Sequence, residues 1–151
     1  VALLADESSQ VRAHALRARL CGAPSLPLAP LTGFLRDRDA GVRQTLALCL
    51  EQAAGVERVE WLRQLLRDPC EAVGRAAARA LANHHDPQTV GALLDAVSTG
   101  RIPVAASAIE SLGALGDADA LPRLRAVARG GDPVLRELAA RAAGRIDESR
   151  A

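Results

Sequence analysis

The sequence predicts an all-α protein built from stacked helical hairpins, and three observations support this fold class. The first is a period of 31 residues, along which Val42, Val73 and Val104 occupy equivalent positions without gaps. The second is the spacing of three and four residues between apolar positions, which is typical of one face of a helix. The third is a composition with one Trp and one Phe, because a core of Leu, Val and Ala suits closely packed helices better than a sheet.

The period divides the chain into successive repeats of a single domain over residues 1–151. A repeat of this length holds two helices that cannot bury their apolar faces alone. The column that holds Leu31 and Leu62 has no member before Val1, so we expect a partial first repeat and a chain that is a fragment of a longer one. About four full helical hairpins follow it. The expected repeats span approximately residues 1–22, 23–53, 54–84, 85–115 and 116–146.

The first elements are the least regular. We expect residues 1–5 to form the tail of a helix and residues 8–20 to form its partner, with Ser8 as the cap. The connection over residues 21–30 carries three prolines and is predicted to be extended. A short helix at residues 31–36 should follow, weakened by an internal glycine.

Asp-Pro pairs mark the expected starts of several later helices. At Asp68, Asp86 and Asp132 the carboxylate is predicted to cap the first turn, with the proline at the first helical position. The later helices are expected at residues 39–51, 56–67, 70–83, 87–97, 104–115, 118–129 and 133–146.

A recurring pattern resembles the HEAT repeat: a leucine, an aspartate two residues after it, and an arginine six residues after the aspartate. It is seen at Asp6 with Arg12 and at Asp37 with Arg43. The short, alanine-rich form is similar to bacterial HEAT-like repeats related to phycobilin lyases. The resemblance covers nearly the whole chain and implies a right-handed α-α superhelix, or solenoid.

In that family the aspartate and the arginine form a hydrogen-bonded ladder between repeats. Two later repeats match only half of the pattern, because Gly74 replaces the arginine of one and Gly130 the aspartate of the other. The fourth repeat has Thr99 and Ala105 and lacks both, so we expect less regular stacking there. The ladder residues implied by the resemblance are Asp6, Arg12, Asp37, Arg43, Asp68 and Arg136.

Net charge and cysteine usage limit the classes of partner and the cellular compartment that suit the protein. With 19 basic and 18 acidic residues the net charge is +1, which argues against a general polyanion binder. Cys21, Cys49 and Cys70 lack CxxC spacing, so we expect reduced thiols in the cytoplasm. Cys49 falls in a column of small residues and is predicted to be a buried apolar side chain. No apolar stretch is long enough to cross a membrane.

Few residues carry the pattern of a catalytic or metal site. His84 and His85 are adjacent in a loop and point apart, so we expect a structural or solvated role, with no metal and no cofactor. Cys70 lies near a helix start, where a thiolate is favoured, but Glu71 opposes its ionisation. We therefore expect no catalytic residues and no enzymatic activity.

A binding surface is expected on the second helices of the repeats, which line the concave face in the HEAT family. Arg75 can pair with Glu71, and Arg141 with Glu137, at the favourable four-residue spacing. Trp61 lies off the apolar face of its helix and should be partly exposed, either packing on the next repeat or anchoring a partner. The candidate partner-binding residues are Arg75, Arg79, Arg141, Gln44, Leu48 and Glu110.

The function that these features favour is a non-catalytic module or scaffold that binds a protein partner. One alternative is an accessory protein of chromophore attachment resembling the phycobilin lyases, which predicts a pocket with an acidic or aromatic set. Another is nucleic-acid binding, as in HEAT-like alkylpurine glycosylases, which needs a basic channel and stacking aromatics. Two aromatic residues and a net charge of +1 speak against nucleic acid.

Overall fold

The chain is all-helical, which confirms the predicted fold class. Every regular element in the described part of the chain is an α-helix or a 3-10 helix. By its internal contacts the chain divides into two compact units, unit 1 over residues 1–80 and unit 2 over residues 81–151. The computed structural model describes residues 2–22, 27–53, 57–85 and 87–150.

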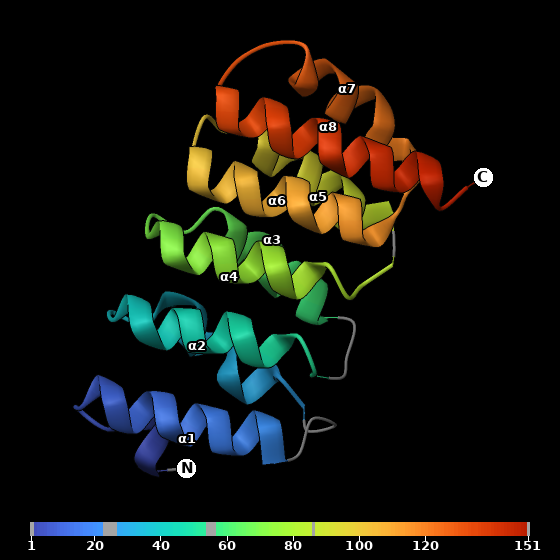
Figure 1. The fold of residues 1–151 in the computed structure, drawn as a ribbon. Helices are drawn as coiled ribbons and strands as arrows, with labels where there is room; N and C mark the ends of the chain where they lie inside the picture. The colour runs from blue at the N-terminus through green and yellow to red at the C-terminus, as the bar shows by residue number, and fades with distance from the viewer. Residues whose placement is uncertain (1, 23–26, 54–56, 86, 151) are drawn as a thin grey trace. The chain divides into compact units, whose positions relative to one another are not determined.

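Unit 1 contains three longer helices that lie side by side and shorter elements behind them. Its elements are η1 (Ala2–Ala5), α1 (Ser9–Gly22), η2 (Ala29–Arg36), α2 (Ala40–Leu50), α3 (Glu57–Leu66) and α4 (Glu71–Leu81). Helices α1, α2 and α4 form one layer, and η2 and α3 lie behind it (Figure 1). Helix α2 is central, because it packs against α1, η2 and α3.

Unit 2 repeats the same two-layer arrangement. Its elements are α5 (Pro87–Val97), α6 (Ile102–Leu115), η3 (Ala118–Ala120), α7 (Leu121–Ala128) and α8 (Pro133–Glu148). Helix α6 packs against α5 and α8, and α8 also packs against α7 (Figure 1). The predicted pairing of a first helix with a second helix is therefore present in this unit.

Two predicted α-helices of unit 1 are 3-10 helices instead. Residues 2–5 are too few to propagate an α-helix, and they form η1. The segment from Ala29 to Arg36 forms η2, with Pro30 in its first turn and Gly33 inside it. Gly33 is a poor α-helix former, which disfavours a regular α-helix over this segment.

The cap predicted at Asp132 is present at the start of α8. The Asp132 carboxylate accepts hydrogen bonds from the backbone nitrogens of Val134 at 2.9 Å and Leu135 at 3.2 Å. Asp39 caps α2 in the same way, accepting from Gly41 at 2.8 Å. Asp86 lies outside the described residues.

The predicted cap at Asp68 is wrong by two residues. Helix α4 begins at Glu71, and the Cys70 carbonyl accepts the backbone nitrogens of Val73 and Gly74. Cys70 therefore holds the position that Asp39 holds one repeat earlier. Asp68 is equivalent to Asp37 instead, and each lies two residues before the cap. The Asp68 carboxylate accepts hydrogen bonds from Arg43.

Two boundaries in unit 2 also differ from the prediction. Helix α6 begins at Ile102, two residues early, because Pro103 fits the first turn of a helix, where its missing N–H is not needed. The helix expected over residues 118–129 divides into η3 and α7, with Pro122 in the first turn of α7. Pro122 cannot donate a backbone hydrogen bond, which separates the two elements.

The periodic apolar columns form the cores of the two units. Val42 and Val73 are buried in unit 1, and Val104 is buried in unit 2. The helices of unit 2 approach closely at Gly113, where an added Cβ would lie 2.9 Å from the Cβ of Ala142. Ala142 belongs to the same 31-residue column of small residues as Cys49, so this member of the column lies at a tight helix contact.

We expect Val73→Asp to destabilise unit 1 by several kcal/mol, because an unpaired carboxylate would replace a fully buried side chain of α4. Chemical denaturation monitored by circular dichroism measures the change. Ala72→Asp is the matched control, since it introduces the same side chain at the adjacent, exposed position of α4. Equal midpoints for the two variants would contradict the assignment of the core face.

Candidate functional site

Two arginines of unit 1 link consecutive repeats through buried, two-pronged ion pairs. Arg12 donates from Nε and Nη2 to the Asp37 carboxylate at 2.8 and 2.7 Å. Its Nη1 donates to the backbone carbonyls of Asp6 at 2.8 Å and Glu7 at 2.9 Å. One guanidinium therefore holds the turn of its own repeat and the aspartate of the next.

Arg43 repeats this geometry one period later. It donates to the Asp68 carboxylate at 2.6 and 2.9 Å and to the Asp37 carbonyl at 2.7 Å. The side chains of Arg43 and Asp68 are 13% and 5% exposed, so this pair is largely removed from water. Fork-like pairing of guanidinium with carboxylate is both strong and directional, so it specifies the register of one repeat on the next.

The aspartates of this ladder also hold the turns in which they lie. The Oδ1 atoms of Asp6, Asp37 and Asp68 accept the backbone nitrogen two residues ahead, at 2.8, 2.9 and 2.8 Å. Burial by itself would raise the pKa of Asp37. The hydrogen bonds from Arg12 and from the Asp39 amide outweigh burial, so the pKa of Asp37 lies below its ordinary value.

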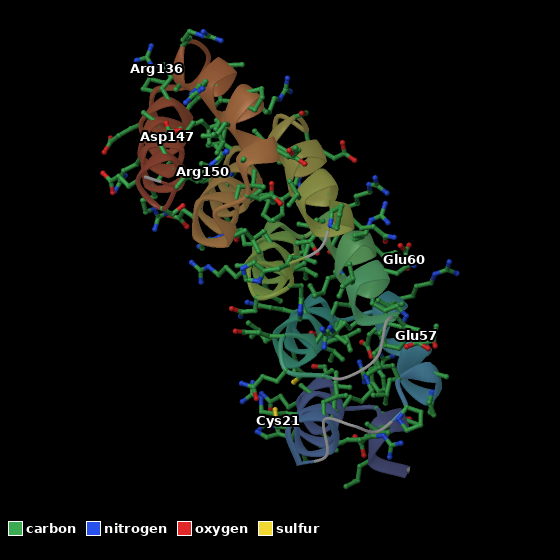
Figure 2. All side chains as sticks on the ribbon, turned by 90° about the vertical axis from the view of Figure 1, so that its right-hand side faces the viewer. Cys21, Glu57, Glu60, Arg136, Asp147 and Arg150 are labelled. Carbon is green, nitrogen blue, oxygen red and sulfur yellow. The ribbon has the colours of Figure 1, made fainter. Side chains whose placement is uncertain are left out.

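The ladder residues predicted from the resemblance do not all come together. Gly74 stands where the pattern would supply the next arginine after Arg43. Arg136 is exposed near the start of α8 (Figure 2), and Gly130 stands where the pattern would place its aspartate. The Arg12–Asp37 and Arg43–Asp68 pairs are thus the rungs that the structure shows in unit 1.

Four of the predicted partner-binding residues line one groove in unit 1. The groove runs between α2 and α4 and has a volume of about 140 Å³. Gln44 and Leu48 form its α2 side, and Arg75 and Arg79 lie one helical turn apart on its α4 side. Its lining residues are Gln44, Leu48, Ala72, Arg75, Ala76 and Arg79.

The two arginines of this groove are available for a ligand. Both are exposed, and among the described residues neither Arg75 nor Arg79 makes a hydrogen bond or an ion pair. The predicted pairing of Arg75 with Glu71 is therefore not observed. Leu48 is 44% exposed and adds an apolar wall to the groove.

The other two predicted residues line a separate groove in unit 2. This groove has a volume of about 380 Å³ and is lined by Glu110 from α6 and by Leu138, Arg141 and Arg145 from α8. The predicted pair of Arg141 with Glu137 is present at 3.3 Å, and both side chains are largely exposed. The groove thus presents two arginines and one carboxylate.

Sequence reasoning missed several lining residues of the two grooves. Arg145 lies one turn after Arg141, and its Nη2 would be 3.1 Å from a Cβ added at Gly113. The four-residue spacing from Arg141 was the signal that could have identified it. Ala72 and Ala76 were missed because small side chains carry no chemical signal, although their size opens the groove of unit 1.

The expectation of partial exposure for Trp61 is wrong. The side chain is 7% exposed, so its indole cannot anchor a partner on the surface of α3. Helix α3 packs against both α2 and η2. Its buried surface is therefore wider than the apolar face expected from the sequence. Trp61 belongs to the core of unit 1.

The residues considered for metal binding or catalysis lie apart. His84 is buried and His85 is exposed, so their side chains point in different directions. The described residues contain no group of three or more His, Cys, Asp or Glu side chains arranged to hold a metal ion. None of the described helices is both long and apolar enough to span a bilayer.

Comparison with known protein families identifies a repeat family. The family model described as HEAT repeats matches residues 28–104 and 59–144, which together cover well over half of the chain. No curated protein matches the sequence.

We expect Arg43→Leu to destabilise unit 1 by about 3–5 kcal/mol, because it removes the guanidinium that neutralises the buried Asp68 carboxylate. Equilibrium denaturation measures the loss. Arg63→Leu removes the partly exposed Glu60–Arg63 pair and is the control, with an expected loss of about 0–1 kcal/mol. Similar losses of unfolding free energy in the two variants would show that the buried Arg43–Asp68 pair stabilises the protein no more than an exposed pair.

Lowering the pH should reduce the unfolding free energy of unit 1 through protonation of Asp37. Its lowered pKa means that the unfolded chain binds a proton at a pH where the folded carboxylate is still ionised. The contribution is present above the ordinary aspartate pKa of about 3.9 and is lost as the pH falls through the lower, folded pKa. Unfolding free energies measured across this range should fall less steeply for Asp37→Asn than for the wild type. Parallel curves would refute this role of Asp37.

Proposed function

Because the chain belongs to the HEAT-repeat family, we propose that it is a non-catalytic module that binds an acidic segment of a partner protein on its second helices. HEAT repeats commonly serve as protein-interaction scaffolds, which supports the general class. The acidic character of the partner is supported by the groove of unit 1. We extend the proposal to a bacterial, cytoplasmic protein, supported by the alanine-rich repeat form and by three cysteines that are free thiols.

The observation that carries the proposal is the pair of unpartnered arginines in the groove of unit 1. Arg75 and Arg79 project from successive turns of α4, so they present two guanidinium groups along one line. Each can bind a carboxylate with two parallel hydrogen bonds. Leu48 supplies apolar contact beside them. The complementary ligand carries two acidic side chains, with an apolar side chain between or beside them.

The groove of unit 2 favours a mixed-charge ligand. Arg141 is already paired with Glu137, but an exposed pair of this kind contributes only about 0–1 kcal/mol, so a partner can replace it at little cost. Glu110 lines the same groove and would repel a purely acidic segment. We therefore assign the acidic determinant to unit 1, where none of the lining residues is acidic.

The test is direct binding of a labelled peptide in which glutamates alternate with leucines, followed by fluorescence anisotropy. A peptide with lysines in place of the glutamates is the ligand control. We expect saturable binding of the acidic peptide and at least a tenfold loss of affinity in Arg75→Glu/Arg79→Glu, equivalent to about 1.4 kcal/mol. Binding should weaken with added salt, because exposed charges are screened.

The matched protein control is Arg123→Glu/Arg125→Glu, which makes the same change in net charge on two exposed positions of α7. It should retain the affinity of the wild type. Loss of binding in this control, with affinity intact in Arg75→Glu/Arg79→Glu, would place the binding surface on the first helices and refute the proposal. Binding of a single-stranded oligonucleotide in preference to the acidic peptide would favour the nucleic-acid alternative instead.

A further inference from the structure

Two cysteines that are far apart in the sequence meet between α1 and α2. The Sγ atoms of Cys21 and Cys49 lie 4.0 Å apart, although 28 residues separate them in the chain. Cys21 is the penultimate residue of α1, and Cys49 is the penultimate residue of α2. Both residues belong to unit 1, and both thiols are free.

The two thiols differ in their access to solvent. Cys21 is exposed at the end of α1 (Figure 2), whereas Cys49 is buried. Burial raises the pKa of the Cys49 thiol to about 12, and the neighbouring Cys21 adds to this effect, while Arg17 opposes it. An oxidant in solution therefore meets Cys21 first, and Cys49 lies behind it as a protected second thiol.

We propose that Cys21 and Cys49 form a redox modification site, at which a small disulfide such as glutathione disulfide converts the two thiols to an intramolecular disulfide. Cys21 reacts as its thiolate with one sulfur of glutathione disulfide. A bond forms between the two sulfurs, the bond between the two glutathione sulfurs breaks, and one glutathione thiolate leaves. Cys49 then loses its proton and attacks Cys21, displacing the second glutathione.

The two steps balance: the protein dithiol loses two electrons and two protons, and glutathione disulfide becomes two glutathione molecules. The sulfurs need to approach from 4.0 Å to the disulfide length of about 2.05 Å. Arg17 precedes Cys21 by one turn of α1 and places a positive charge near the reacting thiols.

The third cysteine is a built-in control. Cys70 lies at the start of α4, whereas Cys21 and Cys49 lie at the ends of their helices.

A disulfide between Cys21 and Cys49 would link α1 to α2 and would close a loop that constrains the unfolded chain. Cys49 directly follows Leu48, so the covalent link would be adjacent to one wall of the groove of unit 1.

The test is incubation of the intact protein with glutathione disulfide at graded ratios to reduced glutathione, followed by acid quenching and mass spectrometry of its peptides. We expect a peptide pair linked through Cys21 and Cys49, with Cys70 outside that link. The linked protein should unfold at a higher temperature than the reduced protein. Cys70→Ser should give the same linked pair.

The Cys49→Ser variant separates the proposed mechanism from simple surface modification. With the second thiol removed, Cys21 should accumulate as a stable mixed disulfide with glutathione, which the wild type resolves. Cys21→Ser should leave Cys49 unmodified under the same conditions, because Cys49 is buried. A stable mixed disulfide on Cys21 in the wild type, or a link that involves Cys70, would overturn the proposal.

Discussion

The constraint on which unit 1 depends is the burial of charged side chains between its repeats. A guanidinium removed from water is tolerated only when its donors meet acceptors of the right geometry. Arg43 meets this requirement with the Asp68 carboxylate and the Asp37 carbonyl, which belong to successive repeats. A shift of one repeat along the other would leave both charges buried and unpaired. The ladder therefore specifies the register of the repeats.

The ladder explains why a period of 31 residues is maintained so strictly in the first repeats. Arg12 and Asp37 are 25 residues apart, and so are Arg43 and Asp68. An insertion between the members of a pair would remove the carboxylate from the reach of the fork. In unit 2, where Thr99 and Ala105 replace the pattern, the helices make close contacts such as that between Gly113 and Ala142.

Local and periodic signals predicted most of the fold, and contacts between elements account for the errors. The range of α5 and the cap at Asp132 follow from residues next to each other in the chain, and both were predicted. The cap of α4 was wrongly assigned to Asp68. Cys70 stands where Asp39 caps α2 one repeat earlier, so Asp68 was the only nearby aspartate in the sequence. The burial of Trp61 depends on elements that pack around α3, which no pattern within that helix reveals.

The arginines that stabilise the fold differ from those exposed in the groove in whether the fold supplies them with a carboxylate. Arg12 and Arg43 are each matched to an aspartate, and the ladder occupies the carboxylates of Asp37 and Asp68. Arg75 and Arg79 are arginines too, but they lie on the outer face of α4. Glu71 precedes Arg75 by one helical turn, yet the two form no ion pair among the described residues. A carboxylate from outside the chain meets two exposed guanidinium groups and displaces no internal partner. Under the proposed function, the groove of unit 1 would therefore bind a carboxylate without breaking an ion pair among the described residues.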